Sequence, residues 1–199
     1  MSSGRALSKK FARVFDSPSS SNESESETGD SDAPATDPFE NLTIRIDIAR
    51  QILELRSGGG VQRTWPVSTA INGAGEREGS QCTPRGRHII HARIGNGAEI
   101  GAVFVGRRPT GEKYSPQLAR QYPDRDWILT RILWLAGTEP GRNLNGEVDT
   151  ESRYIYIHGC PDEAKIGAPG SHGCIRMHNE AVVDLFDRVK TGTGVLIEE

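Results

Sequence analysis

The chain has 199 residues, of which 35% are hydrophobic and 26% are charged, and its formal net charge at pH 7 is −3. This length suits one domain with a self-supporting core, and the near-neutral charge gives no reason to expect a nucleic acid as partner. The three cysteines have no framework spacing, which excludes a disulfide-stapled class and favours a reducing compartment.

The first forty residues differ in composition from the rest and are predicted to be a disordered N-terminal tail, residues 1–40. Residues 5–15 place apolar side chains at helical spacing among basic ones, which is typical of a frayed arm or of a short helix that docks on an anionic surface. Residues 16–40 contain eight acidic and no basic residues, so this part cannot bury enough apolar surface to fold. The N-terminus lacks the apolar core of a secretory signal, and no membrane span is long enough elsewhere, so we expect a cytoplasmic protein.

Residues 41–199 read as a mainly β catalytic domain. From Leu42 onward Ile44, Ile46 and Ile48 alternate with polar residues, as in a half-buried strand. Glycine-, asparagine- and proline-rich turns separate further strand-like runs at 52–55, 61–69, 87–94, 100–106 and 128–135. Many short strands with turns between them predict a β-sandwich or barrel-like domain.

Two later segments depart from the strand pattern. Residues 107–126 are polar, contain three prolines and are long for a connection, so we expect a substrate-covering loop or a flexible insertion with a helical turn at 116–121. Residues 182–189 carry one apolar stripe, with Asn179 placed as N-cap and Gly192 just beyond the end, which predicts a helix packed on the sheet. Residues 194–198 then form a closing strand.

Residues 153–179 carry the candidate chemistry. A strand-like run ends at His158, a Gly/Pro-rich loop follows, and Ser171-His172-Gly173-Cys174 comes next. A cysteine attacks as its thiolate and therefore needs a base or a positive charge nearby. This arrangement indicates a Cys/His acyl-transfer site, although a free cysteine is commonly a buried structural thiol.

These residues resemble the L,D-transpeptidase catalytic domain, also called the YkuD family. The resemblance rests on the strand that ends in His158-Gly159 and on Ser171-His172-Gly173-Cys174-Ile175-Arg176-Met177, with weaker matches at 66–73 and 83–90. It spans roughly residues 42–197. It implies Cys174 as nucleophile, His158 rather than His172 as general base, and attack on murein stem peptides, with no cofactor.

The resemblance also frames the surrounding pocket. The backbone amides of His172, Gly173 and Cys174 are expected to form the oxyanion hole, with Ser171 bonding across the loop. Arg176 is expected to bind a substrate carboxylate, the alternative being an internal salt bridge to Asp162, Glu163 or Asp184. Aromatic residues on strands are candidate pocket walls or plain core: Tyr154, Tyr156 and Trp134. Gly159 offers no side chain to orient His158, so the third catalytic member stays unassigned.

The implied reaction cleaves the bond between the L-centre of the stem's diamino acid, diaminopimelate, and a terminal D-alanine, through a thioester. The absence of a signal peptide favours a cytoplasmic L,D-carboxypeptidase that trims tetrapeptide to tripeptide during murein recycling. The alternative is an L,D-transpeptidase that forms cross-links. Remoter alternatives are a partner-docking protein driven by the acidic tail and a metal-stabilised wall-binding module, in which His158, Cys160, His172 and Cys174 would bind zinc. The oligomeric state is open.

Overall fold

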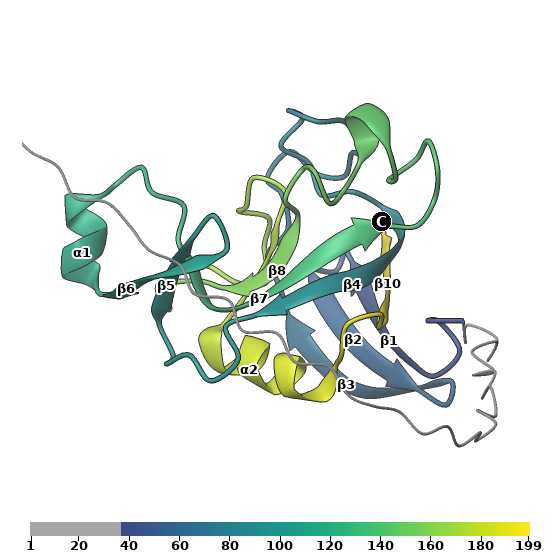
Figure 1. The fold of residues 1–199 in the computed structure, drawn as a ribbon, viewed down its shortest axis with the longest axis horizontal. Coiled ribbons are helices and arrows are strands. Elements are labelled where there is room, and N and C mark those ends of the chain that lie inside the picture. Colours follow the sequence, from purple (N-terminus) through teal and green to yellow (C-terminus); the bar gives the residue numbers. More distant parts are fainter. Residues whose placement is uncertain (1–36) are drawn as a thin grey trace, which may run out of the picture. The chain divides into compact units, whose positions relative to one another are not determined.

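A computed structural model describes residues 37–199 of the chain, so the predicted tail lies almost wholly outside the described residues. The described part is mainly β, with one main helix, as predicted (Figure 1). In chain order its elements are β1 (Leu42–Asp47), β2 (Ile52–Ser57), β3 (Gly60–Pro66), β4 (Gly86–Ile94), β5 (Ala102–Val105), β6 (Arg108–Lys113), α1 (Pro116–Gln121), β7 (Ile128–Gly137), the 3₁₀ helix η1 (Gly146–Val148), β8 (Tyr156–Gly159), β9 (Ile175–Met177), α2 (Asn179–Arg188) and β10 (Gly194–Glu198).

The strands form one mixed sheet. Its main path runs β3-β2-β1-β10-β4-β7-β5-β6, and β8 branches from β7 and carries β9 on its other side. Two pairs are parallel, β1 with β10 and β8 with β9, and the other pairs are antiparallel. The parallel pairs join segments that a hairpin cannot connect, because parallel neighbours need a crossover. The β8–β9 pair positions the two segments that contain His158 and Cys174.

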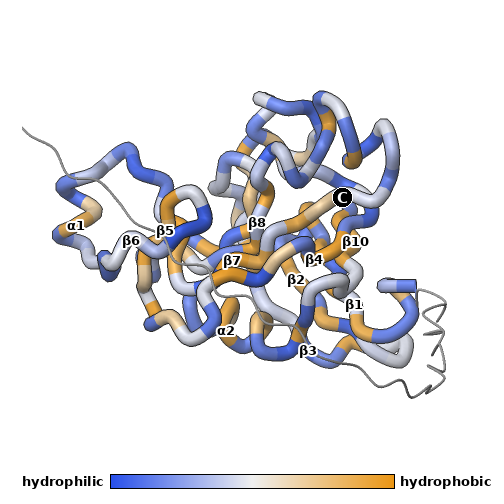
Figure 2. The backbone as a smooth tube through the Cα atoms, in the orientation of Figure 1, coloured by the Kyte–Doolittle hydropathy of each residue, from blue (hydrophilic) through white to orange (hydrophobic). Residues whose placement is uncertain are grey.

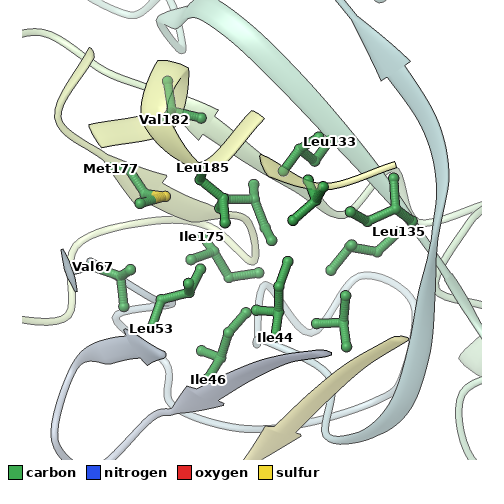
Figure 3. Packing of buried hydrophobic residues seen from close by; sticks show 14 of the residues in the cluster. Ile44, Ile46, Leu53, Val67, Leu133, Leu135, Ile175, Met177, Val182 and Leu185 are labelled. Carbon is green, nitrogen blue, oxygen red and sulfur yellow. The ribbon is translucent and has the colours of Figure 1, made fainter. Parts of the chain in front are cut away.

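The core lies between the sheet and α2. Ile44 and Ile46 are fully buried, as the alternation in β1 predicted, and so are Leu133 and Leu135 of β7. Figure 3 shows side chains from β1, β7 and α2 pointing into one shared interior. Figure 2 shows hydrophobic stretches along central strands such as β7, whereas the turns at the strand ends are mostly hydrophilic. Each fully buried side chain of this kind stabilises the fold by about 1.5–3 kcal/mol.

Helix α2 has the predicted apolar stripe but begins differently. Val182, Leu185 and Phe186 are fully buried against the sheet. The N-cap is His178, and Asn179, predicted as the cap, is the first helical residue. The Asn179 side chain turns inward, where it donates to the Cys160 carbonyl and accepts from Thr130 Oγ1. That buried network competes with capping, so the amide serves the interior.

The segment 107–126 contains more structure than its composition predicts. It holds strand β6, which pairs with β5 as a hairpin, followed by the helical turn α1 that was expected at 116–121. The β5–β6 hairpin and α1 lie at the end of the sheet opposite β3 (Figure 1). The expected loop or flexible insertion therefore contains a paired strand at residues 108–113 that the sequence did not predict. Hairpin pairing satisfies backbone groups without buried side chains, which is why hydropathy gave no signal.

Within residues 37–199, every helix is too short or too polar to traverse a lipid bilayer.

Candidate active site

Strands β8 and β9 bring the two candidate catalytic segments together. Their parallel register pairs Ile157 with Ile175 and His158 with Arg176, and Cys174 directly precedes β9. Because side chains alternate along a strand, His158 and Cys174 fall on the same face of this pair. Ile157 and Ile175 point the other way, into the main core. The register thus places a thiol and an imidazole from distant segments on one face of the strand pair.

The His158 ring is fully buried and its orientation is set by backbone. Its Nδ1 lies 2.8 Å from the Gly159 carbonyl oxygen. A carbonyl can only accept, so Nδ1 carries the proton and Nε2 presents a bare lone pair. Nε2 has no hydrogen-bond partner among the described residues. Burial lowers the pKa of His158, so the ring is neutral at pH 7 and Nε2 is an available proton acceptor.

The Cys174 side chain is half-buried, and its thiol donates to the Tyr154 carbonyl at 3.5 Å. Burial raises the pKa of Cys174 to about 12, although the Tyr156 backbone amide and the charge of Arg176 work against this. The resting pair is therefore a neutral thiol beside a neutral imidazole. Tyr154 has a φ of +56°, a left-handed conformation that costs about 1–3 kcal/mol in a non-glycine residue. This strained turn directs the Tyr154 carbonyl at the sulfur.

The loop before Cys174 is held by buried hydroxyl groups. Ser171 Oγ donates to the Cys174 carbonyl and accepts from the Gly173 amide at 3.2 Å. Thr83 Oγ1 donates to the Gly173 carbonyl at 2.9 Å. Gly173 has a φ of +133°, a conformation that favours glycine, and an added Cβ would also lie 3.1 Å from Ile155 Cδ1, which would have to shift slightly. In this state the Gly173 amide, one of the three expected oxyanion donors, is engaged with Ser171.

Arg176 makes an internal ion pair, but with a partner that the sequence did not single out. Its Nη1 donates to the Gly170 carbonyl at 2.9 Å, and its Nη2 lies 2.8 Å from Asp126 Oδ1. Asp126 is about half exposed, which leaves the carboxylate open to exchange with solvent or ligand. The expected role of Arg176 in binding a substrate carboxylate stays a prediction.

A cluster of aromatic and apolar side chains lies beside the Cys174 sulfur. Tyr156 forms a small buried cluster with Phe104 and Ile132, and Cys174 packs against it. The rings of Trp134 and Tyr156 meet edge to face, with centroids 6.2 Å apart. Tyr156 is buried in this cluster, whereas Trp134 is partly buried against it, and their expected role as pocket walls stays a prediction.

The four side chains of the zinc hypothesis do not form a metal-binding cluster. Among residues 37–199 no three His, Cys, Asp or Glu side chains are placed to hold a metal ion. Cys160 is buried with its thiol donating to the Met177 carbonyl, and burial raises the pKa of Cys160 to about 11. His172 is exposed to solvent.

Several residues that shape the site were not identified as site residues from the sequence, although Thr83 lies in the weaker family match at 83–90. The Arg153 guanidinium donates to the carbonyls of Gly75, Glu76 and Cys82, and the Cys82 carbonyl lies under Gly173. Asp126 and Thr83 reach the site from remote segments, as described above. Such polar residues are expected at the surface, because their partners are distant in sequence: backbone carbonyls for Arg153 and Thr83, and the Arg176 side chain for Asp126. Arg107 also gave no signal, because its partners are aromatic side chains distant in sequence.

Comparison with known proteins identifies the family. Two curated relatives have names that begin "Putative L,D-transpeptidase": YqjB of Bacillus subtilis (strain 168), 48% identical over 50 residues, and a Fuscovulum blasticum protein from the ATP synthase subunits region, 30% identical over 105 residues. These alignments cover 25% and 49% of this chain, but only 28% and 49% of the relatives.

Solved L,D-transpeptidase structures are also similar to the chain, at lower identity. An L,D-transpeptidase from Mycobacterium smegmatis is 18% identical with a TM-score of 0.48, covering 80% of this chain and 59% of that one. The C442S mutant of the Enterococcus faecium L,D-transpeptidase is also 18% identical, with a TM-score of 0.49, covering 80% of this chain and 50% of that one. The model of the L,D-transpeptidase catalytic domain matches residues 41–197, well over half of the sequence, and the chain therefore belongs to this family.

Proposed function

We propose that the chain is a cysteine acyltransferase acting on murein stem peptides, cleaving the bond between the L-centre of the diamino acid and a terminal D-alanine. The observation that carries the proposal is the unpartnered, buried His158 Nε2 on the same strand-pair face as the half-buried Cys174 thiol. A neutral imidazole with a bare nitrogen beside a thiol is the arrangement that general-base activation of a nucleophile requires.

The first half-reaction begins with the thiol leaving the Tyr154 carbonyl. A rotation of the Cys174 side chain turns the S–H toward His158 Nε2, which takes the proton as sulfur attacks the scissile carbonyl. The imidazolium then gives that proton to the departing amine of D-alanine, and a thioester remains on Cys174. The Gly159 carbonyl supports this cycle, because it stays hydrogen-bonded to Nδ1–H in both protonation states.

Backbone amides of the loop 172–174 hold the negative charge that develops on the carbonyl oxygen. Donors fixed before the reaction stabilise such an oxyanion strongly, and losing one typically costs 10²–10³ in rate. Ser171 and Thr83 keep the loop in place through the carbonyls of Cys174 and Gly173. The Gly173 amide joins the oxyanion donors only when it releases Ser171.

The second half-reaction depends on the acceptor. Water yields a tripeptide and makes the enzyme an L,D-carboxypeptidase, which is the outcome favoured in the sequence analysis. The side-chain amine of a second stem yields a cross-link, which is the activity named in the matched relatives. In both cases His158 again acts as base, now toward the acceptor.

One incubation tests the proposal and identifies the acceptor. Purified full-length chain is mixed with a disaccharide tetrapeptide, and products are followed by mass spectrometry. Tripeptide and D-alanine support hydrolysis, whereas a dimer with little tripeptide would replace it with transpeptidation. No product of either kind, from a folded protein, refutes the function.

Cysteine variants supply the matched controls. Cys174→Ala should abolish turnover, since the nucleophile is lost. Cys82→Ala and Cys160→Ala should keep most of it, because the Cys160 thiol is buried and donates to the Met177 carbonyl, and the Cys82 thiol donates to the Asn72 carbonyl. A large loss in either control would implicate these cysteines in the reaction and contradict the assignment to Cys174.

A further inference from the structure

An arginine occupies a turn position that ordinarily favours glycine. Val105 pairs with Arg108 across the β5–β6 hairpin, so Gly106 and Arg107 form a two-residue turn with φ values of +54° and +67°. Such turns prefer glycine, asparagine or aspartate, because a larger side chain strains the left-handed backbone. Arg107 retains that strain, which points to a use for its side chain.

The Arg107 side chain is held in place over the aromatic group beside the thiol. Its guanidinium carbon lies 4.5 Å from the Trp134 ring centroid and 4.7 Å from that of Tyr154. Its Nη1 donates to the Tyr156 hydroxyl at 2.9 Å. Stacking on two rings plus one hydrogen bond fixes the plane of the guanidinium.

The same guanidinium borders a cavity next to the candidate nucleophile. The cavity has a volume of about 540 Å³, and its lining includes Arg107, Trp134 and Tyr154 together with the acidic residues Asp149 and Glu151. Tyr154 links the cavity to the sulfur, because its carbonyl accepts the Cys174 thiol. We call this space the Arg107 cleft.

The chemistry of the Arg107 cleft fits a group that carries both charges. A guanidinium has five N–H donors, and Arg107 spends one on Tyr156 among the described residues. The remaining donors suit a carboxylate, which can accept two parallel hydrogen bonds. The Glu151 carboxylate, which is partly exposed, suits an ammonium, whereas the Asp149 carboxylate already accepts from the Asn145 and Ser152 amides and adds only its charge. An amino group and a carboxylate on one carbon would satisfy both Glu151 and Arg107.

We infer that the Arg107 cleft binds the distal end of the stem's diamino acid and selects a side chain that ends in a free carboxylate as well as an amine. This rests on the proposed function, in which the L-centre of that residue lies at Cys174. Its side chain ends several bonds from the scissile carbonyl, so the distal group falls beside the sulfur and not on it. A diaminopimelate stem meets the requirement, whereas a lysine stem or a diaminopimelate stem amidated at the distal carboxyl lacks the anion.

A double-mutant cycle between enzyme and substrate tests the inference. The enzyme variants are wild type and Arg107→Gln, and the substrates are tetrapeptides with diaminopimelate, its distal carboxamide, or lysine. Charge-assisted hydrogen bonds of this kind are worth a factor of about ten to one hundred. In Arg107→Gln, kcat/KM for the free-carboxylate peptide should fall by about this factor, and by less than about threefold for the other two.

Arg108→Gln is the matched control, because it removes the same charge from the next residue, which is exposed and lies outside the cavity lining. It should leave all three rates within about twofold of wild type. Equal losses on all three peptides in Arg107→Gln, or the same pattern in Arg108→Gln, would overturn the inference.

Binding separates this inference from the proposed function. Calorimetry on Cys174→Ala measures the Kd of the same three peptides without turnover. We expect about tenfold or greater preference for the free carboxylate, lost in the Cys174→Ala/Arg107→Gln double variant. If Cys174→Ala shows no preference for the free carboxylate, or if the preference survives in the Arg107→Gln double variant, the cleft assignment is refuted even if wild type is active. If the preference is present and depends on Arg107, the assignment holds even if wild type gives no product.

Discussion

Gly159→Ala tests how the candidate base is oriented, because Gly159 has no room for even one methyl group. A Cβ there would lie 2.5 Å from Asn179 Oδ1, 2.8 Å from the Leu129 carbonyl oxygen and 3.2 Å from Thr130 Cβ. Leu129 O belongs to the backbone of β7, a central strand paired on both sides. It cannot move aside as a flexible side chain would, so the end of β8 has to shift.

The magnitude follows from two contributions. Overpacking a closely packed interior costs about 1–3 kcal/mol. Displacing Asn179 also weakens its buried bond from Thr130 Oγ1, which adds about 0.5–1.5 kcal/mol. We therefore expect Gly159→Ala to lower the free energy of unfolding by about 1.5–4.5 kcal/mol.

The same shift should affect chemistry through His158. Moving the Gly159 carbonyl away from Nδ1, now 2.8 Å distant, releases the ring and lets the other tautomer form. In that tautomer Nε2 already carries a proton and cannot accept one from Cys174. We expect the rate of Cys174 acylation to fall by about 10–100-fold, if the orienting bond contributes the 1.5–3 kcal/mol usual where one partner becomes charged.

Two assays check this, urea denaturation for stability and intact-mass kinetics of acylation by a carbapenem for the nucleophile. Gly60→Ala is the control, since the nearest atoms to its added Cβ lie 3.9 Å away; it should match wild type in both. A folded Gly159→Ala that unfolds within 0.5 kcal/mol of wild type and is acylated at the full rate would refute the orienting role of the carbonyl.

Three further predictions concern buried polar groups. Burial lowers the pKa of His88 from 6.5 to about 4, so the unfolded chain binds this proton first as the pH falls. The free energy of unfolding should therefore be about 2.5 kcal/mol lower at pH 4.5 than above pH 6.5. Urea denaturation at both pH values should show a smaller decrease in His88→Gln. Asn179→Ala leaves the Cys160 carbonyl and the Thr130 hydroxyl short of partners, so its denaturation midpoint should report a loss of about 2–4 kcal/mol; a loss below 1 kcal/mol would mean that water replaces the amide. Because the pKa of Cys174 is raised to about 12, its alkylation by iodoacetamide should accelerate steadily from pH 7 to 10, and a plateau near pH 8 would contradict a neutral resting thiol.

Local pattern predicted the elements whose side chains meet the core. The isoleucines of β1 and the apolar stripe of α2 predicted which faces of these elements are buried, and the structure confirms both predictions. The boundaries were less secure: Asn179 proved to be an interior amide and not a cap, and β6 was missed. Capping and edge pairing depend on which partner is nearest in space, and the local pattern does not contain that information.

The sequence by itself determined the family, through a run of residues around Cys174 that the family model then matched, and it identified which segments are apolar. Only the tertiary structure decided that β8 and β9 pair in parallel, that Gly159 O orients His158, that Asp126 meets Arg176, and that Arg107 faces a cleft. The physical reason is that burial follows from residue type, which is local, whereas a hydrogen bond or an ion pair follows from distance, which the packed chain alone establishes.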